Sequence, residues 1–174
     1  MKLAIVLLTS LFLLATGSLT ETARAQNAGF SPAGKSFIKD ASSAGLVEVE
    51  LGQVARDKGS SQDVKAYGDR MVLDHGKTNE ELKGIAAQKN VKLPLQVERK
   101  HTTMIAMLSK LSGPEFDRKY MQTMVKHHAA NIARFKRAIR KVKDQDLKAW
   151  ASATLPVLQQ HLQLAKELVQ ILGR

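Results

Sequence analysis

The sequence predicts an all-α protein, an up-down-up-down four-helix bundle with a short extra helix between the second and third long helices. Four segments of the chain repeat apolar residues in alternating steps of three and four, which is the spacing of a helix that buries one face. No segment alternates polar and apolar residues with the period of two that is typical of a strand. The chain also has no glycine-rich phosphate loop.

Residues that start and stop helices mark the ends of the first two long helices. Ser31-Pro32 is suited to open the first helix, since proline fits the first helical turn, and Gly59 is suited to end it. The second helix begins at Ser60 and Asp63 and runs to about Lys89. The very short connection between these helices makes them antiparallel neighbours.

The second half of the chain repeats this arrangement after a break at Pro94. A shorter apolar segment, about residues 95–111, predicts the extra helix, which we expect to lie across one end of the bundle. Ser112 and Glu115 form a capping box for the third long helix, and Asp144 caps the fourth. These two helices are again joined by a short connection, so we expect both short turns at the same end of the bundle.

Each long helix carries one metal-capable residue in the middle of its apolar face, namely Glu48, His75, His128 and His161. We call these four residues the polar layer. Counted from the short turns at about 1.5 Å per residue, the three histidines lie at heights of about 24, 21 and 27 Å. Glu48 comes out at about 15 Å and is the weakest member of the layer.

Imidazoles that converge inside a helical bundle with a carboxylate are suitable ligands for a transition metal. We therefore predict a zinc or copper site formed by His75, His128 and His161, with Glu48 as a fourth ligand or a neighbouring group. His127 lies one position away from the buried face, and its part in the site is left open. Alternatively, the layer is a structural network of buried polar groups that fixes the register of the helices. The residues that would complete such a network are Asp74, Asn79 and Asn131.

The first residues of the 174-residue chain have the pattern of a secretory signal. Lys2 precedes an apolar run from Leu3 to Ala15, and Ala23-Arg24-Ala25 is a suitable cleavage site. We therefore divide the chain into a signal peptide (1–25), a flexible N-terminal segment (26–35) and a helical domain (36–172). The expected location is the periplasm or the exterior. No cysteine is present, so packing alone must stabilise the domain.

The chain is strongly basic, with a formal charge of +11, or +10 once Lys2, Glu21 and Arg24 are removed with the signal. The densest group, which we call the basic run, consists of Lys126, Arg134, Lys136, Arg137, Arg140, Lys141 and Lys143. Such a surface favours an anionic membrane or polymer as partner. We expect no nucleic-acid partner, because aromatic residues that stack on bases do not accompany these charges.

Several blocks of the sequence resemble the DUF4142 family of exported bacterial proteins over about residues 36–168. The blocks are Phe37–Ala41 with Glu48–Gly52, Val64-Lys65, Met71-Val72 with Asp74-His75 and Asn79, Leu93-Pro94, Leu111–Gly113 with Phe116-Asp117 and Tyr120-Met121, and Leu155-Pro156 with His161-Leu162 and Ala165. The resemblance implies a ferritin-like four-helix bundle with no assigned activity. It also implies that Glu48, His75, His128 and His161 occupy the family's recurrent polar positions. The stretch Met124–Ala130 more weakly resembles the DUF305 family, which is sometimes linked to copper.

A di-iron oxidase is not expected, because such bundles take carboxylates from all four helices and two Glu-x-x-His motifs. Here Glu98–His101, in the connection, is the only such motif. No serine or cysteine lies in a nucleophile-elbow context, so binding is expected rather than catalysis. Two functions follow: an exported metal-binding protein, or a non-enzymatic envelope or stress protein with a structural polar layer and a basic face for anionic membranes.

Overall fold

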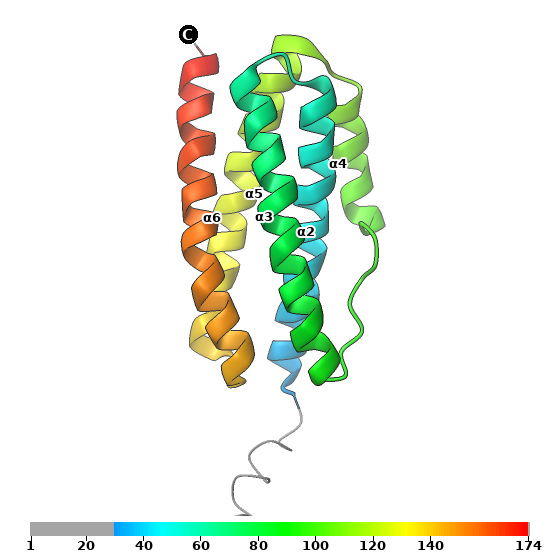
Figure 1. Ribbon diagram of the computed structural model, residues 1–174, viewed down its shortest axis with the longest axis vertical. Coiled ribbons are helices and arrows are strands. Elements are labelled where there is room, and N and C mark those ends of the chain that lie inside the picture. The colour runs from blue at the N-terminus through cyan, green and yellow to red at the C-terminus, as the bar shows by residue number, and fades with distance from the viewer. Residues whose placement is uncertain (1–29, 174) are drawn as a thin grey trace, which may run out of the picture.

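The computed structural model describes residues 30–173, which form a bundle of helices without any strand (Figure 1). The helices are α2 (Pro32–Lys58), α3 (Gln62–Gln88), α4 (Arg99–Ser109), α5 (Gly113–Lys141) and α6 (Gln145–Leu172). The predicted ferritin-like, all-α bundle with a short extra helix is thus confirmed. The predicted signal peptide and residues 26–29 lie outside the described residues. Residues 32–35, which we had placed in the flexible segment, belong to α2.

The long helices do not follow the predicted up-down-up-down order. Asp117, near the start of α5, accepts hydrogen bonds from Ser60 and Ser61 in the α2–α3 turn. Lys89, just after α3, pairs with Asp144 at the start of α6, with 2.7 Å between Nζ and Oδ2. The two short turns therefore lie at opposite ends, and the long helices run up, down, down and up, as Figure 1 shows.

The cause is the connection between α3 and α5. Instead of crossing one end of the bundle, it climbs along the side, where α4 packs beside α2 and buries Ile105 and Leu108 (Figure 1). One long crossover of this kind is a feature of ferritin-like bundles. As a result α2 has α3 and α5 as neighbours, α6 has the same two, and all four neighbouring pairs are antiparallel.

Asp117 shows how the crossover is fixed at its far end. Its carboxylate is 1% exposed and accepts three hydrogen bonds, from the amides of Ser60 (3.0 Å) and Ser61 (2.8 Å) and from the Ser60 hydroxyl (2.6 Å). An acid at the N-terminus of a helix satisfies its free amides and favours its dipole. The turn that leads into α3 is thus held by a residue of α5, whereas the sequence had suggested a local start at Ser60 and Asp63.

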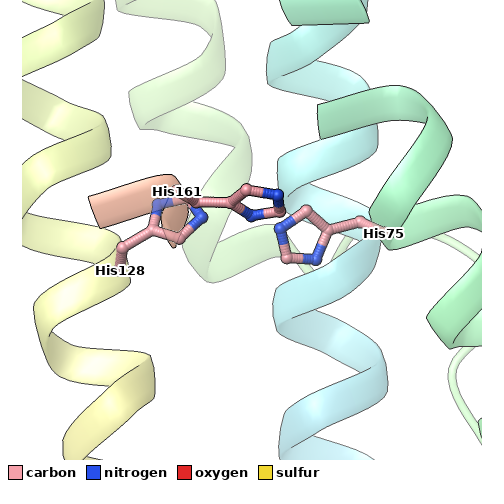
Figure 2. A group of neighbouring side chains, drawn as sticks. All are labelled: His75, His128 and His161. Carbon is pink, nitrogen blue, oxygen red and sulfur yellow. The ribbon is translucent and has the colours of Figure 1, made fainter. Parts of the chain in front are cut away.

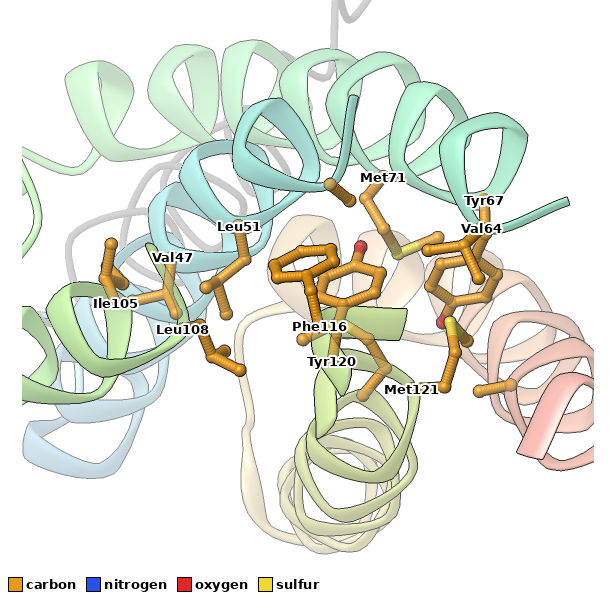
Figure 3. Packing of buried hydrophobic residues seen from close by; sticks show 13 residues of the cluster. Val47, Leu51, Val64, Tyr67, Met71, Ile105, Leu108, Phe116, Tyr120 and Met121 are labelled. Atoms are coloured by element: carbon orange, nitrogen blue, oxygen red, sulfur yellow. The ribbon is translucent and has the colours of Figure 1, made fainter. Parts of the chain in front are cut away.

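The polar layer divides the apolar core into two clusters. One lies toward the α2–α3 turn and contains Leu51, Met71 and Met124 (Figure 3). The other lies toward the α5–α6 turn and includes Leu82 and Ile132. In α3, for example, His75 separates Met71 of the first cluster from Leu82 of the second. The layer therefore interrupts an otherwise continuous hydrophobic interior near the middle of the bundle.

Candidate metal centre

Three helices bring their histidines together at the centre of the bundle. His75 comes from α3, His128 from α5 and His161 from α6, and their side chains point toward one another (Figure 2). The residues are 6%, 0% and 0% exposed. Their ring centroids form a nearly equilateral triangle with sides of 5.7, 5.3 and 5.3 Å. This is the histidine cluster that the sequence predicted.

The spacing of the ring nitrogens suits a shared ion. One nitrogen from each histidine lies within 4.8 Å of the other two. A point therefore exists that is at most about 2.8 Å from all three, which is 4.8 Å divided by the square root of three. A zinc–nitrogen bond is about 2.0–2.1 Å long, so each nitrogen would have to move by at most about 0.8 Å to reach bonding distance.

Two of the three imidazoles are held by an acceptor on the far side of the ring. The Nε2 of His161 lies 2.8 Å from Oδ2 of Asp74, and the Nδ1 of His128 lies 3.0 Å from the Met124 carbonyl oxygen. Because a carboxylate and a carbonyl can only accept, these nitrogens carry the hydrogen and donate it. The lone pair is then on Nδ1 of His161 and on Nε2 of His128.

Those two lone-pair nitrogens are buried without a hydrogen-bond partner, and so is Nε2 of His75. Hydrogen-bond acceptors on the far side of metal-binding histidines, like Asp74 and the Met124 carbonyl here, commonly fix the ring and its tautomer. Burial lowers the pKa of His75 to about 3 and also lowers the pKa of His161, despite the opposing effect of Asp74. Both rings are therefore neutral at pH 7, which is the form that binds a metal ion.

Glu48, on α2, lies beside the cluster and interacts electrostatically with His128 and His75. Its carboxylate is fully buried, and neither oxygen has a hydrogen-bond partner. Burial raises the pKa of Glu48, but the interactions of its carboxylate with His128, His127 and His75 in their protonated forms outweigh this effect and lower the pKa to about 2. Glu48 and His75 were both counted from the α2–α3 turn, but His161 was counted from the turn at the opposite end. Counted from the α2–α3 end, His161 lies at about 17 Å, close to Glu48 at about 15 Å. Counted correctly, all four residues lie near the middle of their helices.

Among the described residues, His127 is the one basic side chain within ion-pair distance of that carboxylate, with 3.4 Å between its Nδ1 and Oε1 of Glu48. This is ion-pair distance, but the geometry is not that of a hydrogen bond. Glu48 does not join the group of ligand atoms within 4.8 Å, which contains only the three histidines among the described residues. It therefore borders the cluster and supplies its negative charge.

Of the possible network partners, only Asp74 bonds to a histidine of the layer. Asn131 accepts from Arg134 instead. His101 also lies outside the cluster, on α4. The network expected between polar side chains is thus incomplete, since one nitrogen on each histidine and both oxygens of Glu48 have no partner.

Comparison with known proteins identifies the family. The family model described as "Domain of unknown function (DUF4142)" matches residues 19–168. A solved structure, the crystal structure of a DUF305 fragment from Deinococcus radiodurans, superposes with a TM-score of 0.71 at 13% identity and covers 84% of this chain and 99% of that one. This likeness supports the fold. No curated protein matches the sequence. The family model spans most of the chain, which therefore belongs to the DUF4142 family.

Proposed function

We propose that this protein is an exported metal-binding protein that holds one zinc or copper ion through His75, His128 and His161. The proposal rests on one observation: each of the three histidines has a buried ring nitrogen without a hydrogen-bond partner, and the three offer nitrogens that lie within 4.8 Å of one another. A buried polar atom without a partner costs stability. One ion would provide a partner for all three at once.

The donor set favours zinc or copper over other ions. Imidazole nitrogens suit zinc and copper, whereas magnesium and calcium prefer oxygen ligands. Of the two carboxylates beside the cluster, Asp74 is hydrogen-bonded to His161, so only Glu48 is free to bind, and bridging ligands for two irons are missing among the described residues. The negative charge of Glu48, with neutral histidines, would offset one of the two charges of a divalent ion.

The test is metal analysis and calorimetric titration of the mature protein with Zn²⁺ and Cu²⁺. We expect one ion per chain for the wild type and loss of tight binding in His75→Ala and His161→Ala. His101→Ala is the matched control, because this histidine lies outside the cluster. Equal metal binding by wild type, His75→Ala and His161→Ala would overturn the proposal.

A second candidate function, as an envelope or stress protein that contacts anionic surfaces, is favoured by the basic run. Its members Lys136, Arg137, Arg140, Lys141 and Lys143 are exposed, and none forms an ion pair with another of residues 30–173. None of the described helices has an apolar stretch long enough to span a membrane. Contact with lipid would therefore be electrostatic and weakened by salt.

Vesicle co-sedimentation tests this candidate. We expect binding to vesicles that contain phosphatidylglycerol, release by salt, and weaker binding when Arg137 and Arg140 are changed to Gln. Binding that is independent of salt and of lipid charge would exclude it.

A further inference from the structure

A continuous line of polar side chains crosses the bundle from one face to the other. It begins at Asp74 in the groove between α3 and α6, where the side chain is 33% exposed, and passes through His161 to the other histidines. On the other side of the cluster, the buried carboxylate of Glu48 interacts electrostatically with His128 and His75. It lies 3.4 Å from His127, whose side chain is 26% exposed, between α2 and α5. The candidate metal centre thus has a link to solvent at each end.

The two ends of this line differ in their hydrogen bonding. At one end, Asp74 and the fully buried ring of His161 share a hydrogen bond of 2.8 Å. The His161 ring therefore separates Asp74 from the other two histidines. At the other end, Glu48 and His127 lie 3.4 Å apart without hydrogen-bond geometry, and both carboxylate oxygens are unpartnered. Little therefore holds the Glu48 carboxylate in one orientation.

A pocket reaches the looser end from outside. It has a volume of about 150 Å³ and lies between α2, α4 and α5. Its polar lining consists of Asp40, Ser43, Lys100, His101, His127, Asn131 and Arg134. His127 is thus the side chain that faces this pocket and contacts Glu48, whereas Glu48 itself is fully buried.

From this asymmetry we infer that His127 and Glu48 form a transient outer cation site, the port through which a metal ion reaches the three histidines. The inference rests on the proposed metal binding and adds its route. An ion in the pocket binds the His127 imidazole and the free Glu48 oxygens, and the carboxylate then passes it inward to His128 and His75. Imidazole and carboxylate are ligands of the same kind as those of the inner centre. No bond other than those to the ion forms or breaks.

Stopped-flow absorbance with Co²⁺, whose visible spectrum reports its coordination by nitrogen, tests the port. We expect His127→Phe, which fills the same space without a ligand atom, to slow association by about tenfold or more. Dissociation uses the same path in reverse, so it should slow equally and leave the Kd within about threefold of wild type. A purely structural role of His127 would not scale both rate constants together.

Two other variants separate the port from its surroundings. His101→Phe, in the same pocket but without contact to Glu48, should load at the wild-type rate. Glu48→Gln, which keeps the shape and removes the charge, should slow loading even if His127→Phe folds poorly, as judged by circular dichroism.

The outcomes are distinct. If wild-type protein binds no Co²⁺ or Zn²⁺ in calorimetry, the metal-binding function fails, and the port with it. If wild type binds but His127→Phe and Glu48→Gln both load at its rate, only the port is overturned. Slower loading in Asp74→Asn alone would likewise overturn it, since the ion would then pass between α3 and α6.

Discussion

At the scale of single residues, the two carboxylates of the candidate centre have different tasks because their surroundings differ. Asp74 is partly exposed and accepts one short hydrogen bond from His161. Glu48 is fully buried, and its oxygens have no hydrogen-bond partner. A carboxylate like Asp74 orients a ligand from outside, whereas one like Glu48 is available to a cation.

Asp74→Asn should weaken zinc binding by about 10- to 100-fold, because the neutral amide no longer fixes the tautomer of His161 or increases its basicity. Isothermal titration calorimetry measures the effect. The control is Asp69→Asn, an exposed acid on the same helix that pairs with Arg56. An unchanged affinity in Asp74→Asn would show that the hydrogen bond to His161 does not support the ligand.

The metal-free protein should lose stability as the pH falls below about 6.5. Burial depresses the pKa of His75 to about 3 and lowers that of His161, so below the ordinary pKa of 6.5 the unfolded state binds more protons than the folded state. The stability that these groups contribute is thus complete above pH 6.5 and decreases as the pH falls toward 3. Glu48, with its pKa lowered to about 2, adds a loss of the same sign below pH 4.5.

Guanidinium denaturation between pH 7.5 and 5 checks this dependence. Each neutral histidine should contribute a slope of up to about 1.4 kcal/mol per pH unit, and His75→Leu should reduce the total slope. A denaturation midpoint that stays constant down to pH 5 would contradict neutral, buried imidazoles.

At the scale of the helices, α2 and α3 pack closely at a pair of glycines. A Cβ on Gly52 would lie 2.6 Å from the Gly68 carbonyl oxygen, and a Cβ on Gly68 would lie 2.7 Å from that of Gly52. Both obstacles are backbone atoms, so a side chain at either position would push the helices apart. This contact sets the distance between the helices that carry Glu48 and His75.

Gly52→Ala should therefore lower the free energy of unfolding by about 1–3 kcal/mol. Gly84→Ala is the matched control on α3, since a Cβ there meets nothing within 4 Å. That variant should gain about 0.5–1 kcal/mol, because alanine restricts the unfolded chain and favours the helix. Chemical denaturation of both variants measures these free energies of unfolding. A Gly52→Ala variant as stable as Gly84→Ala would refute the close contact.

At the scale of the whole molecule, the polar layer interrupts the core between two apolar clusters, so a bound ion would join the halves of the bundle. Zn²⁺ at about 100 times its Kd should add about 2.7 kcal/mol and raise the Tm of a domain of this size by about 5–10 °C. Differential scanning calorimetry measures the shift. Mg²⁺ should leave the Tm unchanged, and so should Zn²⁺ with His75→Ala. An equal shift in His75→Ala would place the bound zinc elsewhere.

Most of the fold could be predicted because its helices follow from local sequence patterns. The apolar spacing of three and four defined the long helices, and Ser31, Gly59 and Asp144 marked ends that the structure confirms. The direction of α5 could not be predicted, since nothing in residues 89–112 says whether the connection crosses an end or climbs the side. The role of Asp117 was missed for the same reason: it holds a turn 56 and 57 residues away in the sequence.

The sequence by itself determined that four helices each carry one polar residue near the middle of a buried face. Because the three histidines lie near the midpoints of helices of similar length, they share a level whichever way the helices run. Only the tertiary structure decided that Glu48 belongs to this level, that Asp74 holds His161, and that His127 links Glu48 to a pocket. These relations depend on which helices are neighbours and on their directions, and both are fixed by long-range packing rather than by local sequence.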